Sequence, residues 1–422
     1  MRTTAGDSVV RWASEILQSG AICDECLGRA FGKLGRGLTN EARGQALRTL
    51  GTMLGSSGKS GECWVCGDAF LKVEEMASRA AEAVQGFEFA TYLFGVVLTP
   101  RLAEMEALFA ERFPTGHIEP VKHAFNRAVG RAFDRRFDGV TVDFSHPHVR
   151  FDIDLSDDSM RLHVDSIYMY GRYRKLVRGI PQTRWPCRRC RGSGCPACHG
   201  SGKQYPESVE ELIGRPFQEA AGGHGVHLHG AGREDIDALM LGTGRPFVLE
   251  VEGPHRRTLD LESLRVTANA DAQGKAEIVS IQETTKATVA LVKETKAQKR
   301  YRAVVQFGDP IDEAALHRAV SGLIGTVHQR TPQRVSHRRA DLVRERNLYD
   351  ASGRIAGTDR AVVEFLAEGG LYIKELVSGD DGRTTPNLAQ EAGSTAWVTE
   401  LDVMDVRSSR FPDAECGTVD IS

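Results

Sequence analysis

Apolar residues recur at three- and four-residue spacing through much of the N-terminal part of the chain, which predicts short amphipathic helices. We expect helices over residues 9–17, 40–54, 73–84, 102–113 and 122–137. Alternation of apolar and polar positions predicts strands over residues 87–98, 140–144, 148–154 and 161–168. This mixture indicates an α+β region whose sheet has one face toward solvent.

The C-terminal part shows the same two patterns. A capping box at Ser208 and Glu211 begins a helix that runs toward Ala221, and further helices are expected over 287–296 and 312–324. Strands are expected over 247–251, 276–281, 299–307, 361–367 and 397–406, and a glycine-rich turn at 369 leads into another helix. We see no internal repeat by inspection.

Length and composition fit an ordinary globular protein. A chain of 422 residues should form roughly two or three domains, and 41% hydrophobic with 26% charged residues argues against disorder. The net charge is −3, so binding to nucleic acid would need local basic patches. No apolar run follows a basic start, and the longest apolar stretch, near 87–99, is too short to cross a bilayer. We expect a cytoplasmic protein without membrane contact.

Eight of the nine cysteines fall in four Cys-x-x-Cys pairs, and Cys416 stands apart. In a chain without a secretion signal, this pairing favours metal thiolates over disulfides. The first two pairs flank a predicted helix and can together bind one structural Zn²⁺ through Cys23, Cys26, Cys63 and Cys66. The alternatives are four reduced thiols or two redox pairs.

The other two pairs lie within residues 187–198, separated by glycines, and resemble a compact zinc ribbon tip. We assign a second structural Zn²⁺ to Cys187, Cys190, Cys195 and Cys198. An iron–sulfur cluster is the alternative, and His199 could replace one sulfur. Neither cluster suits hydrolysis, because a catalytic zinc keeps an open position beside His or carboxylate ligands.

Two stretches are strongly basic. Residues 172–191 contain eight Arg or Lys residues and no acid, with Tyr173 and Trp185 between them. Arginine beside aromatic rings suits phosphate contact and base stacking, whereas the alternative is a solvated linker. We favour RNA and assign contacts to Arg172, Arg174, Lys175 and Arg178. The second stretch, 330–339, contains proline and is expected to be a loop, in which we assign Arg334, His337 and Arg338 to RNA.

A glycine-rich, charged loop over 230–246 precedes the strand at 247. An acid in such a turn is exposed on a rigid scaffold, where catalytic groups are commonly placed. It is not a phosphate loop, because Gly242 and Gly244 precede a strand and no Lys-Ser/Thr pair follows. The alternative is a surface turn whose Asp235 and Asp237 only accept backbone hydrogen bonds.

Three segments together resemble a known family. Residues 231–247, 331–339 and 371–387 closely resemble the tRNA pseudouridine synthase family called Pus ten, and the segment beginning Gly171-Arg-Tyr-Arg-Lys resembles its archaeal branch. The resemblance covers most of residues 170–405. The N-terminal part matches more loosely, through its cysteine pairs and a region similar to a THUMP RNA-binding domain.

The resemblance implies an α+β fold in three parts. Residues 1–69 would form a zinc-binding segment, and 70–180 a THUMP-like RNA-binding domain. Residues 181–422 would form the pseudouridine synthase catalytic domain, with the cysteine cluster at 187–198 as an insertion. That domain would contain a mixed, largely antiparallel sheet flanked by helices.

The resemblance also implies an activity, the isomerisation of uridine 54, uridine 55 or both in the TΨC loop of tRNA. Asp235 follows the Gly-Arg-x sequence that precedes the family's catalytic aspartate. Tyr301 matches the tyrosine that stacks on uracil, and Lys374 matches the basic partner of the aspartate. Leu401 matches an apolar residue against the base, and we add Tyr372 as a substrate contact. The implied partner is the TΨC arm of tRNA, with no organic cofactor and no sign of a protein partner.

The residue types suit this chemistry independently of the resemblance. A carboxylate can act as a nucleophile toward C1′ of ribose or C6 of uracil, and an aromatic ring can hold a flipped base. The sequence does not choose between the two carbon atoms. A noncatalytic zinc-containing tRNA-binding protein or chaperone is the alternative function, and a zinc-dependent hydrolase is disfavoured by the cysteine-only ligand sets.

Overall fold

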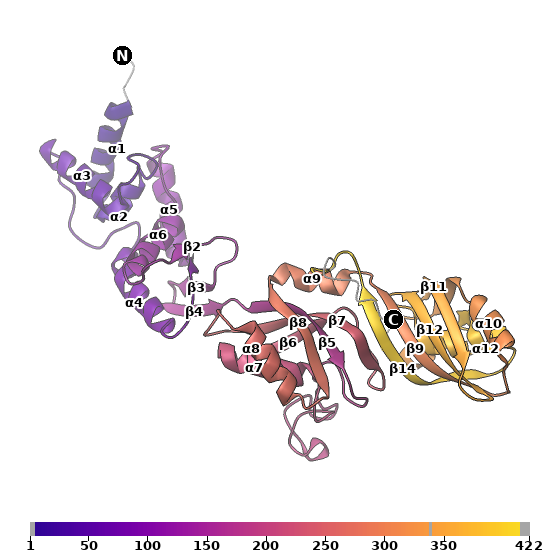
Figure 1. Ribbon diagram of the computed structural model, residues 1–422. Helices are drawn as coiled ribbons and strands as arrows, with labels where there is room; N and C mark the ends of the chain where they lie inside the picture. The colour runs from indigo at the N-terminus through magenta and orange to yellow at the C-terminus, as the bar shows by residue number, and fades with distance from the viewer. Residues whose placement is uncertain (1–4, 337–339, 414–422) are drawn as a thin grey trace. The chain divides into compact units, whose positions relative to one another are not determined.

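The computed structural model describes residues 5–336 and 340–413. Contacts divide the chain into two compact units, Met1–Asp165 and Ser166–Ser422, each with its own hydrophobic core (Figure 1). The predicted boundary at 180 differs, because residues 167–175 pair within the sheet of the second unit. Within the described ranges, no helix has both the length and the apolar character needed to span a membrane.

The first unit consists of helices around a small sheet. Its helical elements are α1 (Ala5–Ser19), α2 (Asp24–Arg29), α3 (Asn40–Met53), η1 (Ala69–Lys72), α4 (Val73–Ala83), α5 (Pro100–Arg112) and α6 (Val121–Asp134). Its strands are β1 (Thr91–Val97), β2 (Thr141–Val142), β3 (Val149–Asp154) and β4 (Ser159–Val164), in the order β2-β1-β3-β4. The core contains the stacked rings of Phe94 and Phe151, with Phe133 of α6 against both.

Two glycines set the crossing of α2 and α3. A Cβ atom on Gly28 would lie 1.8 Å from the Asn40 carbonyl oxygen, and one on Gly44 would lie 1.9 Å from that of Asp24. The helix backbones therefore touch where any side chain would separate them. Because α2 begins directly after Cys23 and contains Cys26, this contact helps to fix two cysteines of the first cluster.

The second unit is built on a ten-stranded sheet. The strands are β5 (Ile167–Lys175), β6 (Gly225–Gly230), β7 (Leu239–Glu252), β8 (Ala276–Thr284), β9 (Gln298–Phe307), β10 (Gly325–Arg330), β11 (Val343–Ile355), β12 (Arg360–Glu368), β13 (Thr384–Thr385) and β14 (Ala396–Arg407). Their order is β13-β10-β11-β12-β9-β14-β7-β5-β8, with β6 beside β7. Among the described strands, β14 and β7 form the one parallel pair of this sheet.

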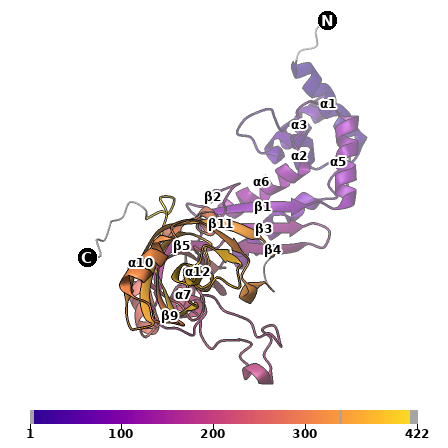
Figure 2. The ribbon, with the colours of Figure 1, turned by 90° about the vertical axis from the view of Figure 1, so that its right-hand side faces the viewer.

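Helices pack on this sheet, which is visibly twisted in Figure 2. The helical elements of the second unit are η2 (Pro196–Cys198), α7 (Val209–Ala221), α8 (Leu261–Asp271), α9 (Lys286–Glu294), α10 (Glu313–Ser321), η3 (Gln333–Val335), α11 (Ile373–Ser378) and α12 (Leu388–Ala392), of which η2 and η3 lie in loops. The helix α7 packs on β6, β7 and β8, and α10 packs on β11. The predicted class, α+β with a mixed and largely antiparallel sheet flanked by helices, is confirmed.

Two expectations about strands were wrong. Gly242 and Gly244 do not precede the strand but lie inside β7, where both have positive φ. A Cβ on Gly242 would lie 1.9 Å from the Met404 carbonyl oxygen, so close contact with β14 requires glycine there. The expected strand over 161–168 is divided between β4 and β5, which belong to different units.

Candidate active site and cysteine clusters

Asp235 lies in the loop that joins the antiparallel strands β6 and β7. The base of this loop is closed by hydrogen bonds from the Ala231 amide to the Pro246 carbonyl oxygen and from the Gly232 amide to that of Gly230. Gly232 has a φ of 81°, which favours glycine. The sequence expectation that the acid sits in a glycine-dependent turn is therefore confirmed.

A network of buried side chains holds this loop in place through an ion pair and hydrogen bonds. The Glu234 side chain is 0% exposed, and one of its carboxylate oxygens lies 2.8 Å from Nε of the buried Arg245. The Tyr173 hydroxyl donates to Glu234 at 2.9 Å, and Gln182 donates to the Tyr173 oxygen at 2.8 Å. Because Glu234 is drawn inward, its neighbour Asp235 points outward, with 39% of its side chain exposed.

Lys175 holds the same loop through its main chain. Its ammonium donates to the carbonyl oxygens of Ile180, Asp235 and Ile236 at 3.0, 3.2 and 3.1 Å. The residue is 0% exposed, and three carbonyl acceptors take the place of water around its charge. Burial lowers the pKa of Lys175. The assignment of Lys175 to RNA contact is therefore wrong.

The neighbouring arginines are also engaged within the protein. Arg172 pairs with Asp413 and donates to the carbonyl oxygens of Gly244 and Val406. Arg174 donates to the Gly242 carbonyl oxygen at 2.7 Å and pairs with Glu277. These contacts fix the glycine-containing bend of β7.

Arg178 completes this set. It donates to the carbonyl oxygens of Asp237 and Leu401 at 2.7 and 2.9 Å and pairs with Asp402. The guanidinium groups of Arg172, Arg174 and Arg178 therefore join strands and loops of the sheet, and their assignment to RNA contact stays a prediction. Periodicity could not reveal this, since the acceptors come from residues far along the chain.

Two cations flank the Asp235 carboxylate. Nη1 of Arg334 lies 3.2 Å from Oδ2 of Asp235, and Nζ of Lys374 lies 3.6 Å from the same oxygen. Lys374 is closer to Asp237, at 2.7 Å from Oδ2. The structure thus brings together Asp235 and Lys374, which the sequence pairs only by resemblance. It adds Arg334, which we had assigned to RNA.

Arg334 and Lys374 are placed by neighbouring elements. Arg334 lies in η3, and its Nε donates to the buried carboxylate of Glu375 at 2.6 Å. Its guanidinium carbon lies 5.7 Å from the ring centroid of Tyr372. Gln329 of β10 both donates to and accepts from the Tyr372 main chain, at 3.0 and 2.8 Å, which fixes the start of α11. His337 and Arg338 lie outside the described residues.

Tyr301 and Leu401 lie on one face of the sheet. Tyr301 pairs with Val403, and Leu401 pairs with Ala303, so their side chains share a face of β9 and β14. Both are 8% exposed. Burial raises the pKa of Tyr301 to about 12; the charge of Arg245 lowers it and that of Asp235 raises it.

Sequence reasoning missed the buried support of this site. Glu234, Arg245, Gln182 and Lys299 were not singled out, although Arg245 is the one basic residue of β7. Lys299 lies against the loop, since a Cβ on Gly232 would be 2.7 Å from its ammonium nitrogen. Burial lowers the pKa of Lys299 to about 7, and Arg245 contributes in the same direction.

Each predicted cysteine cluster is assembled. In both groups of four, the sulfur atoms all lie within 4.8 Å of one another. Cys23 and Cys66 are 3.6 Å apart, and in the second group Cys190 and Cys198 are 3.8 Å apart. A tetrahedral S₄ site with Zn–S bonds of about 2.3 Å places its sulfurs about 3.8 Å apart. Both groups therefore have the dimensions of a metal site.

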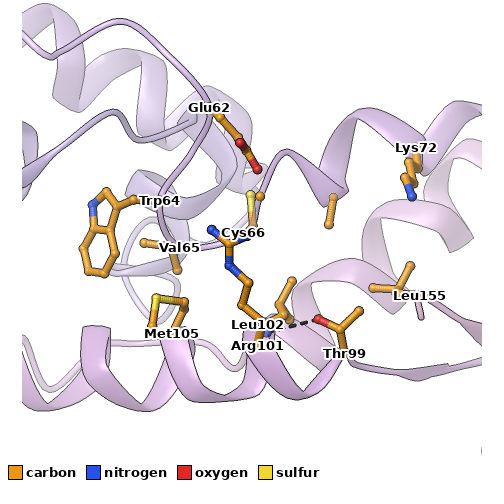
Figure 3. Close-up of a pocket in the computed structure, with 12 residues that line it drawn as sticks. Glu62, Trp64, Val65, Cys66, Lys72, Thr99, Arg101, Leu102, Met105 and Leu155 are labelled. Carbon is orange, nitrogen blue, oxygen red and sulfur yellow. Dashed lines mark hydrogen bonds between the residues drawn. The ribbon is translucent and has the colours of Figure 1, made fainter. Parts of the chain in front are cut away.

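A cavity of about 180 Å³ adjoins the first cluster. It lies between the loop that contains Cys66 and the helix α5, and Arg101 extends from α5 across it toward that loop (Figure 3). Its lining residues all belong to the first unit and include no carboxylate between two cations. The arrangement around Asp235 is therefore the better candidate for catalysis.

The second cluster also contains an internal repeat that inspection of the sequence had missed. Residues 187–194 read Cys-Arg-Arg-Cys-Arg-Gly-Ser-Gly, and residues 195–202 read Cys-Pro-Ala-Cys-His-Gly-Ser-Gly. The backbone repeats as well, with φ of 52° at Arg191 and 50° at His199. Both serines of the repeat donate 2.7 Å hydrogen bonds to the carbonyl oxygen of the cysteine three residues before them. The expectation of no repeat was wrong.

Two family models and several named proteins match this chain. A family model described as "Pus10, C-terminal" matches residues 168–407, and one described as "Pus10 THUMP domain, archaeal" matches residues 76–154. The protein named tRNA pseudouridine synthase Pus10 of Halorubrum lacusprofundi is 46% identical over 417 residues, covering 96% of this chain and 97% of that protein. Its namesake from Methanothrix thermoacetophila is 43% identical over 427 residues, covering 94% of each.

Among solved structures, the chain is similar to one in the crystal structure of a Cbf5-Nop10-Gar1 complex, over 47% of this chain and 45% of that chain, with 14% sequence identity and a TM-score of 0.31.

Proposed function

The chain belongs to the Pus10 family of tRNA pseudouridine synthases, and we propose that it isomerises uridine 54, uridine 55 or both in the TΨC arm of tRNA, with Asp235 as the nucleophile. The observation that carries the proposal is the half-exposed carboxylate of Asp235 between Arg334 and Lys374, on a loop held by buried groups. A THUMP domain in the first unit agrees with a tRNA substrate.

The reaction breaks the bond between N1 of uracil and C1′ of ribose and forms one between C5 and C1′. C5 loses a proton and N1 gains one, so the product is an isomer of uridine. Asp235 would attack C1′ of the ribose or C6 of the base, and either route requires the ionised carboxylate. Arg334 at 3.2 Å and Lys374 at 3.6 Å stabilise that negative charge. The uracil stays in the site between bond breakage and bond formation, so its position must be held.

Tyr301 and Leu401 supply a surface for the base. A uridine within a folded tRNA loop must leave its stack to reach Asp235, and an aromatic ring can hold it there. Tyr301 is fixed by β-pairing on both sides, to Phe365 of β12 and Val403 of β14. We propose that the uracil stacks on Tyr301 with Leu401 against its edge, and that Tyr372, which lies against Arg334 just before α11, also contacts the substrate.

We propose that both cysteine clusters bind Zn²⁺ and that the ions are structural. Four cysteine ligands close the coordination sphere, so neither ion would keep an open position for water or substrate. The dimensions of the two groups fit S₄ coordination, with sulfur separations from 3.6 to 4.0 Å in the pairs that approach most closely. The proposed isomerisation requires no organic cofactor.

The test is incubation of the pure protein with tRNA transcribed in vitro, followed by mapping of pseudouridine at single-nucleotide resolution. Pseudouridine at position 54 or 55 and nowhere else is the expected result. Tight tRNA binding without any product would instead favour the noncatalytic RNA-binding alternative. Product at a position outside the TΨC arm would retain the enzyme and overturn the proposed target.

A further inference from the structure

The segment between β5 and α7 contains the second cysteine cluster and extends away from the sheet in both views (Figures 1 and 2). We call residues 184–205 the knuckle. Its two ends are joined by hydrogen bonds from the Cys187 amide to the Gly202 carbonyl oxygen at 2.8 Å and from the Gln204 amide to that of Trp185 at 2.9 Å. The rings of Trp185 and Tyr205 pack edge to face across this stem, 5.7 Å apart. The two ends of the knuckle are therefore held together by main-chain hydrogen bonds and by ring packing.

Its tip is formed by the two halves of the eight-residue repeat, which pack against each other reciprocally. A Cβ on Gly194 would lie 2.8 Å from the Gly200 carbonyl oxygen, and one on Gly202 would lie 2.2 Å from that of Gly192. Backbone contact this close restricts the relative movement of the halves. Side chains on the tip are therefore held by a compact scaffold.

The halves differ in charge. Arg188 and Arg189 lie between the cysteines of the first half, where the second half has Pro196 and Ala197. Together with Arg191 and with Arg184 at the stem, they give four exposed arginines. Within the described part of the chain, none of these four guanidinium groups has an acid or carbonyl oxygen within bonding distance, and residues 181–206 contain no Asp or Glu. The nearby Lys203 is neutralised by Glu211.

A bound Zn²⁺ would not cancel this charge. Four thiolates and one zinc ion sum to a charge of about −2, so four arginines leave the knuckle positive. The whole chain carries a net charge of −3, which makes this local surplus stand out. Guanidinium groups recognise phosphate through paired N–H donors, and RNA is the polyanion on which the family acts.

The root of the knuckle is attached to the loop of Asp235. Gln182 donates to the Gly232 carbonyl oxygen at 3.1 Å, and Arg233 donates to the Thr183 hydroxyl. The Gly179 amide donates to the Ile236 carbonyl oxygen at 2.9 Å. An RNA segment bound by the knuckle would therefore lie on the side of the Asp235 loop to which residues 179–183 are attached.

We propose that the knuckle is an RNA-binding arm whose arginines Arg184, Arg188, Arg189 and Arg191 contact the phosphate backbone of the tRNA whose uridine is bound at Asp235. The inference rests on the proposed function and deepens it, since it names a second contact with the same substrate. Among the described residues, the four arginines of the knuckle make no such internal contacts, in contrast to Arg172, Arg174 and Arg178, whose guanidinium groups bind within the protein.

The test compares the triple variant R188Q/R189Q/R191Q with Ala197→Gln, which places the same side chain at the position of the second half equivalent to Arg189. Affinity for unmodified tRNA is measured by direct binding over a range of salt concentrations, together with zinc content and turnover at saturating tRNA. For the triple variant we expect about tenfold weaker binding and a salt slope lower by about 0.7–0.9 for each phosphate that the protein no longer binds. Zinc content and turnover at saturating tRNA should stay near wild type.

Ala197→Gln should match the wild type in every measurement. Unchanged affinity and salt slope in the triple variant, or an equal loss in Ala197→Gln, would overturn the proposal. If the triple variant loses zinc, Arg184→Gln decides, because Arg184 lies outside the cysteine spacing: a lower salt slope supports the arm and an unchanged one rejects it. Direct binding does not depend on product, so a failure of the proposed activity remains distinguishable.

Discussion

Arg334 forms an ion pair with Asp235, with Nη1 3.2 Å from Oδ2, and so links the loop after β10 to the loop between β6 and β7. The same guanidinium is anchored on the buried carboxylate of Glu375 at 2.6 Å. Arg334 is therefore positioned before substrate binds, and its charge is available at the carboxylate that we propose as the nucleophile. We therefore propose that Arg334 acts at the candidate active site and not only along the RNA path.

Replacement of Arg334 by Gln should lower turnover at saturating tRNA by about 10- to 100-fold, because the variant has no fixed positive charge at this place beside the reacting carboxylate. Arg330→Gln is the matched control, since Arg330 lies in the same basic stretch but pairs with Asp341. Single-turnover rates of both variants check the prediction. Equal rates for Arg334→Gln and the wild type would remove Arg334 from the catalytic step.

Replacement of the buried Lys175 by Met should destabilise the protein by about 2–4 kcal/mol, because three carbonyl oxygens lose their donor. Turnover should also fall, since two of those carbonyls belong to Asp235 and Ile236. The salt slope of tRNA binding should not change. Lys275→Met, which breaks an exposed pair with Glu207, is the control and should cost less than about 1 kcal/mol. A reduced salt slope for Lys175→Met would restore the RNA assignment.

Lys299 should make folding stability change with pH between neutral and alkaline values. Its pKa is lowered to about 7 in the folded protein, chiefly by burial, whereas an unfolded lysine titrates near about 10.4. Between these values the unfolded chain binds more protons, so this residue makes stability rise with pH from about 7 upward. Lys299→Met should remove that dependence and raise the melting temperature below pH 7. Thermal unfolding from pH 6 to 10 measures it, and an identical pH profile for both proteins would contradict the effect of burial.

Metal analysis should find two zinc ions per chain. Cys26→Ser and Cys190→Ser should each reduce the content to one, because each removes a ligand from a different cluster. Cys416→Ser, outside both cysteine clusters, should leave it unchanged. Loss of the first ion should also lower the unfolding temperature of the first unit, whose core includes Cys26, Cys63 and Cys66. A wild-type protein without bound metal after purification in zinc-containing medium would contradict both sites.

The sequence was most informative where a function depends on local pattern. The glycine turn around Asp235, the Cys-x-x-Cys pairs and the strand that contains Tyr301 each depend on residues close together in the chain, and each was found. Resemblance added Lys374, which periodicity alone would have left as a surface lysine on a helix. The structure places its ammonium 3.6 Å from Asp235.

The features that the sequence did not predict depend on contacts between residues far apart in the chain. The arginines before residue 180 look like an RNA-binding run, but β5 lies between β7 and β8, and their acceptors come from β7, β14 and the Asp235 loop. Nothing in the local pattern reveals that Lys175 is inside the protein. The repeat at 187–202 was visible in the letters but became evident through its repeated backbone angles and hydrogen bonds.

The most direct measurement compares pseudouridine formation by Asp235→Asn and Asp237→Asn on tRNA transcribed in vitro. Both variants remove one carboxylate charge from the same loop, and both aspartates contact Lys374. We expect Asp235→Asn to lower the rate by about 10³-fold or more while tRNA binding is kept, because the variant has no nucleophile. Asp237→Asn should stay within about tenfold of the wild type. Pseudouridine formation by Asp235→Asn at the wild-type rate would contradict the assignment of Asp235 as the nucleophile.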